Sequence, residues 1–227
     1  MMRAVLLSLL LLHAAIFGQL RAGEATTVKE LQAADRLQVE SEISPAEGLV
    51  PGQQARLLRT VATDRWFSGG TRIVIPEVPG RVILQTEQFA SNASENRGGQ
   101  SWVIQRWTLD VYPQRAGDFV IPPMTLKVKV NAGPAVDLEG ELSAPAVRFP
   151  VSVPAALEQA DHWVAAPAYS VSQNFDRPLT DLQVGDAFER EVVFEATGVM
   201  AMMLPAFEVT EQDGLAAYPA PHRELHL

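Results

Sequence analysis

Hydrophobic and polar residues alternate along much of the chain after residue 36, and the alternation marks five segments. Apolar side chains occupy most alternate positions in these segments, with charged or hydroxyl side chains between them. Successive side chains of a strand point to opposite faces of a sheet, so this period of two predicts half-buried antiparallel strands. The segments lie at residues 37–43, 103–111, 124–130, 147–153 and 192–196.

Turn sequences separate these segments and leave little room for long helices. The chain has 16 prolines and 15 glycines, and proline breaks the hydrogen bonding of a helix interior. The best helical candidates, residues 28–35 and 155–160, are both short. Many short strands joined by turns are typical of immunoglobulin-like β-sandwiches. The predicted fold class is therefore all-β.

Two consecutive immunoglobulin-like units are expected. The first sandwich spans residues 37–153 and follows an N-terminal segment of residues 26–36. Within it, Leu138 and Leu142 either return to the first sheet or lead into the second unit, and we expect the former. A linker at residues 154–161 leads to a second unit at residues 162–227. A complete immunoglobulin-like domain takes ~100 residues, so the second sandwich is short or incomplete.

The first 25 residues are predicted to be a secretory signal peptide. Arg3 precedes an apolar run, and small residues follow the run, which is the usual order of such a peptide. The run is short for a membrane span, which needs about 20 residues, and a retained anchor is the alternative. Cleavage after Gly18 and cleavage after Ala25 both fit. The expected location is a bacterial periplasm.

Charge and cysteine content exclude several classes of function. The chain has 18 Lys and Arg against 27 Asp and Glu, a formal net charge of −9. Phosphate binding needs a surplus of positive charge, so a general nucleic-acid binder is not expected. The chain has no cysteine, which rules out disulfides, zinc–thiolate sites and a thiol nucleophile.

No catalytic motif stands out in the sequence. The Gly-x-Ser-x-Gly elbow, the phosphate-binding loop and the His-Glu-x-x-His motif are missing. His222 and His226 have the spacing of helical metal ligands, but nearby prolines favour a solvated tail, and His162 is expected to pack or cap. We predict that the chain is no enzyme, with no cofactor, no metal and no small-molecule substrate.

Aromatic residues offer the clearest candidate binding surface. Trp66 and Phe67 precede Ser68-Gly69-Gly70 and could form a partner-binding patch at a loop tip. Packing in the core is the other interpretation of this pair. A carbohydrate-binding module that stacks sugars on Trp66, Phe67 or Trp102 is the alternative function. Trp107 shares an apolar face with its neighbours and is expected in the core.

Three ordered blocks carry a family resemblance. The first is Arg65–Gly70 with Pro79-Gly80 and residues 89–95. The second runs from Gly99-Gln100-Ser101-Trp102 through Tyr112-Pro113 to residues 116–123, and the third covers residues 184–190 with later matches up to residue 219. Together they resemble the bacterial BatD family of oxygen-tolerance proteins over about residues 37–221.

The residues of these blocks are expected to hold the fold. Tyr112 should end a strand and act as a corner through its hydroxyl group, and Pro113 should stop pairing. Gly117 should supply a turn, followed by a strand that Pro122-Pro123 interrupts. In the third block, Gly185 lies in a turn. Asp186 could pair with Arg190, although an exposed pair contributes only ~0–1 kcal/mol.

The resemblance implies a non-enzymatic, exported interaction protein with immunoglobulin-like domains. Family members work with membrane proteins that carry von Willebrand A domains and with a MoxR-type ATPase. An acidic loop residue could complete the metal site of such a domain, and Asp118 is the candidate. Family members usually end in a transmembrane helix, so we expect a truncated product, a fragment or a free periplasmic form. Inner-membrane association would then come through partners or through a helix beyond Leu227.

Overall fold

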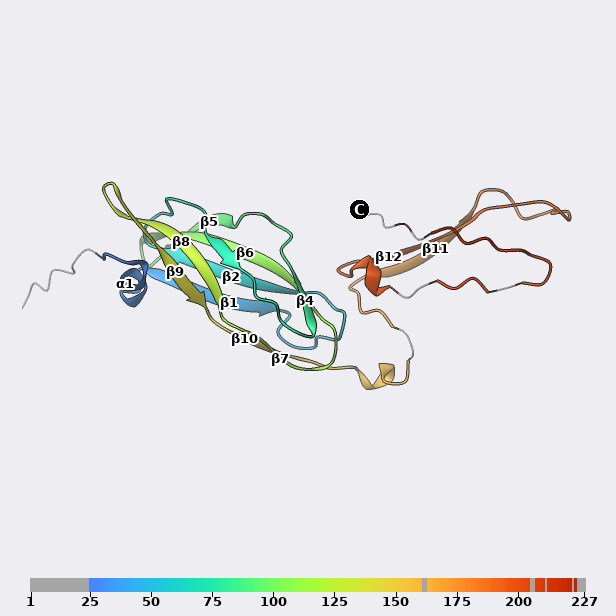
Figure 1. Cartoon of the computed structure of the whole chain (residues 1–227), viewed down its shortest axis with the longest axis horizontal. Coiled ribbons are helices and arrows are strands. Elements are labelled where there is room, and N and C mark those ends of the chain that lie inside the picture. The colour runs from blue at the N-terminus through green and yellow to red at the C-terminus, as the bar shows by residue number, and fades with distance from the viewer. Residues whose placement is uncertain (1–24, 161–162, 205–206, 211, 222, 224–227) are drawn as a thin grey trace, which may run out of the picture.

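The computed structural model describes residues 25–160, 163–204, 207–210, 212–221 and 223. Strands dominate these residues, so the predicted all-β class is confirmed (Figure 1). Within them, α1 (Val28–Ala33) is the single α-helix, and η1 (Ala155–Leu157) and η2 (Ala201–Met203) are 3-10 turns. No helix in this part of the chain is long and apolar enough to cross a membrane.

One layer of the first unit is a five-stranded antiparallel sheet with the order β1-β2-β6-β4, in which β5 also pairs with β6. Its strands are β1 (Leu37–Ser44), β2 (Ala55–Thr63), β4 (Arg81–Leu84), β5 (Ser91–Arg97) and β6 (Gln100–Pro113). The length of β6 allows two short strands to share one of its edges, since β5 pairs with its first half and β4 with its end. Strand β2 pairs along the other edge.

The opposite layer consists of a three-stranded sheet and a two-stranded ribbon. The sheet has the order β3-β8-β9, and the ribbon pairs β7 with β10. These strands are β3 (Arg72–Val74), β7 (Gly117–Ile121), β8 (Met124–Gly133), β9 (Val136–Ala144) and β10 (Val147–Val151). Leu138 and Leu142 thus lie in β9, where they face Val130 and Leu126 of β8.

Prolines divide what would otherwise be one long ribbon. Met124 faces Ala144 in the β8–β9 pair, and Ile121 faces Val147 in the β7–β10 pair. Both pairs therefore keep the same register across the break. Pro122-Pro123 on one side and Pro145 on the other lie in this gap, where their missing N–H groups cost no ladder bond. The expected interruption by Pro122-Pro123 is confirmed.

The two layers enclose a single main hydrophobic core. Its members come from both layers and include Leu57, Leu109, Leu126 and Val130, all of which are fully buried. The indole N–H of Trp107 donates to Thr71 Oγ1 at 3.0 Å inside this core, so the predicted core position of Trp107 is confirmed. Burying apolar side chains from both layers is the main force that holds the first unit together.

Helix α1 begins where the sequence predicts a helix and packs on β9. The hydroxyl group of Thr27 caps it by accepting from Glu30 N at 3.2 Å, a bond that satisfies a free N–H of the first turn. Val28 and Leu31 are its buried residues. Val28 lies directly over Gly140 of β9, where any larger side chain would push the helix away.

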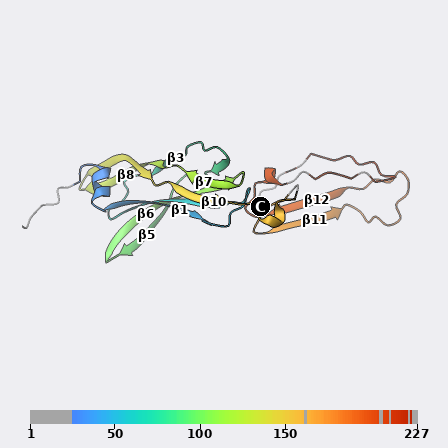
Figure 2. The same cartoon turned by 90° about the horizontal axis from the view of Figure 1, so that it is seen from below.

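The second unit contains one described antiparallel ribbon, β11 (Tyr169–Phe175) with β12 (Arg190–Ala196). Figure 2 shows β11 along one margin of this unit, with the C-terminal coil on the other side of β12. Every residue classed as buried in the described chain lies between Val28 and Val151. The ribbon therefore has no enclosed core of its own.

Candidate functional site

Trp66 is an exposed aromatic side chain on a fixed backbone. Its side chain is 65% exposed, while its carbonyl oxygen accepts from Asn131 N at 3.0 Å. On the other side of Phe67, Ser68 N donates to Lys129 O at 3.1 Å. These two bonds attach the backbone of the segment to the edge of β8, and the indole ring extends from this fixed backbone into solvent.

A hollow of about 340 Å³ opens beside this ring. It is lined by side chains from three separate parts of the first unit, and they are Asp64, Arg65, Trp66, Ser101, Val103 and Asn131. The end of β2, the first half of β6 and the end of β8 meet here, because Thr63 of β2 faces Val103 of β6. The hollow thus combines one aromatic face with a carboxylate, a guanidinium, an amide and a hydroxyl group.

The polar side of the hollow is only partly satisfied. Asp64 Oδ2 accepts from Arg36 Nε at 2.9 Å and from Gln100 Nε2 at 2.9 Å. Its second oxygen and the Nε atom of Arg65 are both shielded from solvent and have no hydrogen-bond partner among the described residues. These two atoms lie 4.0 Å apart, too far for a hydrogen bond. The two groups therefore attract each other as an ion pair without a hydrogen bond.

This arrangement shares features with the interfaces of protein complexes. Tryptophan and arginine are the residues that most often dominate the energy of protein interfaces, and an ordered backbone lowers the entropy lost on binding. The described residues also contain no cluster of three acidic or histidine side chains with the geometry of a metal site.

The other aromatic candidates lie elsewhere. Phe67 is half-buried, forms a bridge with Val130 and packs against the core. Trp102 is only 7% exposed and belongs to a small cluster with Ala62 and Ile104, under the guanidinium of Arg97. Of the three aromatic residues considered for sugar stacking, only Trp66 offers an open face.

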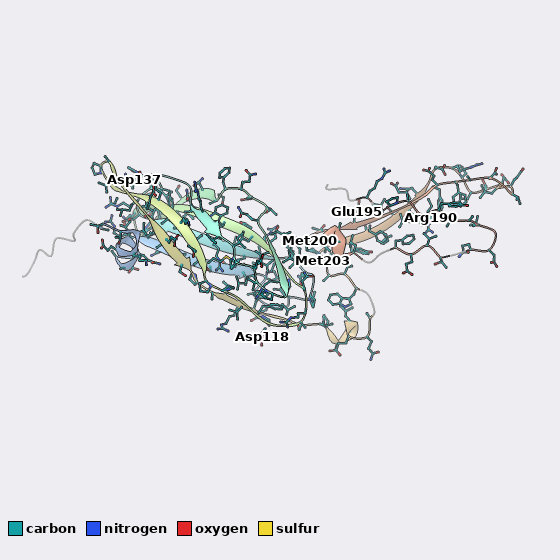
Figure 3. All side chains as sticks on the ribbon, viewed as in Figure 1. Asp118, Asp137, Arg190, Glu195, Met200 and Met203 are labelled. Atoms are coloured by element: carbon teal, nitrogen blue, oxygen red, sulfur yellow. The ribbon has the colours of Figure 1, made fainter. Side chains whose placement is uncertain are left out.

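Asp118 differs from its predicted setting. It lies within β7, opposite Pro150, and not in a turn. The side chain is exposed. Figure 3 places it at the opposite end of the first unit from Asp137, which pairs with Asn131 at the Trp66 end. Trp66 and Asp118 therefore belong to two separate surfaces.

The second block of motif residues is only partly as expected. Pro113 remains paired with Arg81 and its carbonyl oxygen accepts from Gly52 N at 2.7 Å, so the expected end of pairing is wrong at this residue. Tyr112 is buried beside it, and the corner role of its hydroxyl group stays a prediction. Burial, and to a lesser degree Asp110, raises the pKa of Tyr112. Gly117 is the first residue of β7, opposite Val151, and does not lie in the turn as predicted. Its φ of +136° favours glycine.

The third block forms a turn without the expected ion pair. Gly185 adopts φ +100°, and Asp186 closes its own turn by accepting from Gln183 N at 2.9 Å. No ion pair between Asp186 and Arg190 is found in the described part of the chain. Arg190 instead lies over the ring of Phe207, 5.5 Å from its centroid, because a flat guanidinium stacks well on an aromatic face.

Some predictions concern residues outside the described ranges. The signal peptide falls almost wholly on residues 1–24, and the three histidines His162, His222 and His226 are also outside them. Asp64 and Arg65 were not singled out as site residues, although they directly precede Trp66 in the sequence. Ser101 and Asn131 join the hollow through strand pairing, which no local pattern reveals.

Comparisons of the chain with models of protein families, with curated proteins and with solved structures find no match. The resemblance to the BatD family therefore rests on the three sequence blocks alone. The chemistry of the site is accordingly inferred from its own side chains, above all from the exposed ring of Trp66 and the polar hollow beside it.

Proposed function

We propose that the chain is an exported, non-enzymatic protein-interaction module of BatD type, and that its first unit is an immunoglobulin-like sandwich. Its partners would be membrane proteins with von Willebrand A domains that act with a MoxR-type ATPase in stress and oxygen tolerance. Two sheets packed around a common core support the sandwich. The three ordered sequence blocks support the family.

The single observation that carries the proposal is the exposed Trp66 ring on a hydrogen-bonded backbone beside a polar hollow. An interface hot spot needs a large side chain that is already ordered before binding. Arg65 and Asp64 supply unsatisfied polar atoms at the same place. Burying the ring against a partner would gain apolar contact.

Asp118 is the proposed second contact, on a separate surface. An exposed carboxylate on an edge strand is accessible to the metal ion of a von Willebrand A domain. Magnesium and calcium take oxygen ligands, so a carboxylate could complete such a site. Binding through Asp118 would require the metal ion, whereas binding through Trp66 would not.

Capture from solubilised membranes tests the proposal. Tagged full chain should recover a von Willebrand A domain protein, and Trp66→Ala should reduce recovery about 10-fold or more, as expected for a hot spot. Phe89→Ala is the matched control, because Phe89 is 78% exposed in the same unit but lies outside the hollow. Recovery of no such protein, or equal recovery by Trp66→Ala, would contradict the proposal.

A carbohydrate-binding module is the second candidate, and the open Trp66 ring next to carboxylate and amide groups favours it. Sugar rings stack on aromatic faces while their hydroxyl groups bond to such polar groups. A glycan array with hits that Trp66→Ala removes would replace the first proposal with this one. An array without hits would eliminate the carbohydrate function.

A further inference from the structure

The outer edge of β11 presents a row of backbone groups that form no hydrogen bond to any described residue. Thr197 N donates to Ala168 O at 3.0 Å, and Asp176 N donates to Glu189 O at 3.2 Å. Both bonds continue the β11–β12 register, so even-numbered residues of β11 bond to β12. In an antiparallel pair the alternate residues point away, which directs the N–H and C=O groups of four residues outward: Tyr169, Val171, Gln173 and Phe175.

The β11–β12 ribbon also has one apolar face. Tyr169, Val171 and Phe175 share this face with Val192 and Phe194, because cross-strand partners point to the same side. Phe188 and Phe207 cover part of it, with ring centroids 5.9 Å from those of Phe175 and Phe194. The three β11 side chains remain largely exposed. A two-stranded ribbon is only marginally stable in water, so more strands would stabilise it.

Strand β11 lacks the features that protect sheet edges. Its sequence, Tyr-Ser-Val-Ser-Gln-Asn-Phe, contains no charged residue and no proline, although the chain carries a net charge of −9. Exposed edges are normally protected by charged side chains, prolines or bulges. The partner strand β12 carries Arg190, Glu191 and Glu195, and β1 carries Glu40 and Glu42. The β11 edge is therefore open to pairing.

We propose that the β11 edge binds the β11 edge of a second copy of this chain, antiparallel, with Ser172 on the two-fold axis. In this register Tyr169 faces Phe175 of the second copy and Val171 faces Gln173 of the second copy. All four outward-facing residues are then used, and each pair exchanges two N–H···O bonds. Shifting the register by two residues in either direction loses one of the four pairs.

The composition of the strand favours a second copy as the occupant. A two-fold interface brings identical surfaces together, so a charge near the axis would lie close to its own copy, and β11 has no charge. The strand has aromatic residues at both ends, which face each other in the proposed register and pair well across strands. The apolar faces of the two ribbons join into one four-stranded sheet.

Single cysteines test the register, because the chain contains no cysteine. At the axis, Ser172→Cys places two sulfur atoms on a non-hydrogen-bonded pair with Cα atoms ~4.5 Å apart, within reach of a disulfide. Ser170→Cys is the matched control. It lies on the same face, but the two copies of residue 170 would be roughly 13 Å apart along the strands.

Under mild oxidation of the full chain, Ser172→Cys should form covalent dimer about 10-fold or more faster than Ser170→Cys. Only the two copies of residue 172 are close enough for a disulfide. Equal rates, or a faster Ser170→Cys, would overturn the proposed pairing. Circular dichroism of both reduced variants checks that the fold is retained. Absence of covalent dimer from Ser172→Cys would also overturn it.

Sedimentation equilibrium provides the second measurement. In the wild-type chain the fraction of dimer should rise with protein concentration. Val171→Pro should stay monomeric, because proline removes an outward N–H group of β11 and keeps the hydrogen bonds to β12. Val171→Thr keeps that N–H and should still dimerise. Trp66→Ala should dimerise like the wild type, which separates this interface from the proposed partner site. A monomeric wild type would contradict the inference.

Discussion

The two β units of this chain begin from similar strand patterns and differ in what covers them. In β8, apolar side chains at alternate positions are buried between two layers, whereas in β11 all seven residues are exposed. Both strands are paired with a neighbour. Strand pairing therefore does not by itself create a core, because a sheet must pack its apolar face against a second layer.

The contrast predicts different sources of stability. The first unit buries apolar side chains from both of its layers. Removing this surface from water stabilises the unit without association with another chain. Among the described residues of the second unit, Phe188 and Phe207 give the ribbon partial cover. We expect its stability to depend on association at the β11 edge.

The largest effect should come from removing a core side chain. Leu109 is fully buried between the layers, and Leu109→Ala should lower the free energy of unfolding by about 3 kcal/mol through lost transfer energy and a cavity. Val184→Ala in the second unit is the control, because Val184 is fully exposed. Urea unfolding followed by tryptophan fluorescence measures both. Equal losses of unfolding free energy in the two variants would contradict the proposed difference in stability between the units.

A smaller loss should follow from crowding the contact between α1 and β9. A Cβ atom at Gly140 would overlap the side chain of Val28, so Gly140→Ala should cost about 1–3 kcal/mol by displacing the helix. Gly70→Ala is the matched control, since nothing lies within 4 Å of its Cβ position. Thermal unfolding compares the two variants. A Gly140→Ala variant as stable as Gly70→Ala would contradict this close packing.

The pH dependence of stability tests whether water reaches Arg59 in the core of the first unit. Arg59 is fully buried, Nη1 donates to Pro145 O at 2.6 Å, and Nε and Nη2 have no partner among the described residues. Burial lowers the pKa of Arg59 to about 10, which is below the pKa of the unfolded chain. The unfolded state then binds more protons above pH 10, so this group adds stability as the pH rises.

Arg59→Met removes this contribution. The free energy of unfolding of the wild type relative to Arg59→Met should therefore rise between pH 9 and pH 11, because burial disfavours the charged form of Arg59, which loses its proton in this range. Urea unfolding across that range measures the difference. A constant difference would show that Arg59 keeps its charge at no cost and that water reaches it.

The sequence predicts strands well where one face is wet. The alternation near residues 37–43, 103–111, 124–130, 147–153 and 192–196 corresponds to β1, β6, β8, β10 and β12. Strand β2 shows no such alternation because most of it is buried on both faces, and β5 shows none because it is exposed on both. Strand β11 was missed although Tyr169, Val171 and Phe175 lie at alternate positions. A period of two needs a difference between the faces.

The candidate site was only partly predictable. Trp66 stood out because an aromatic residue precedes a glycine-containing turn, but the same argument applied to Phe67, which packs against the core. Local sequence cannot decide which of two neighbouring aromatic residues points inward. Ser101 and Asn131 reach the hollow through long-range strand pairing, which depends on the register of the sheets.

Residue-resolved amide hydrogen exchange tests most directly whether the first unit is stable alone while the second depends on association at the β11 edge. With rising protein concentration, exchange at the outward N–H groups of Tyr169, Val171, Gln173 and Phe175 should slow, because they become bonded only in the dimer. Exchange in β8 should stay slow and unchanged. Exchange in β11 that is independent of concentration would contradict the account.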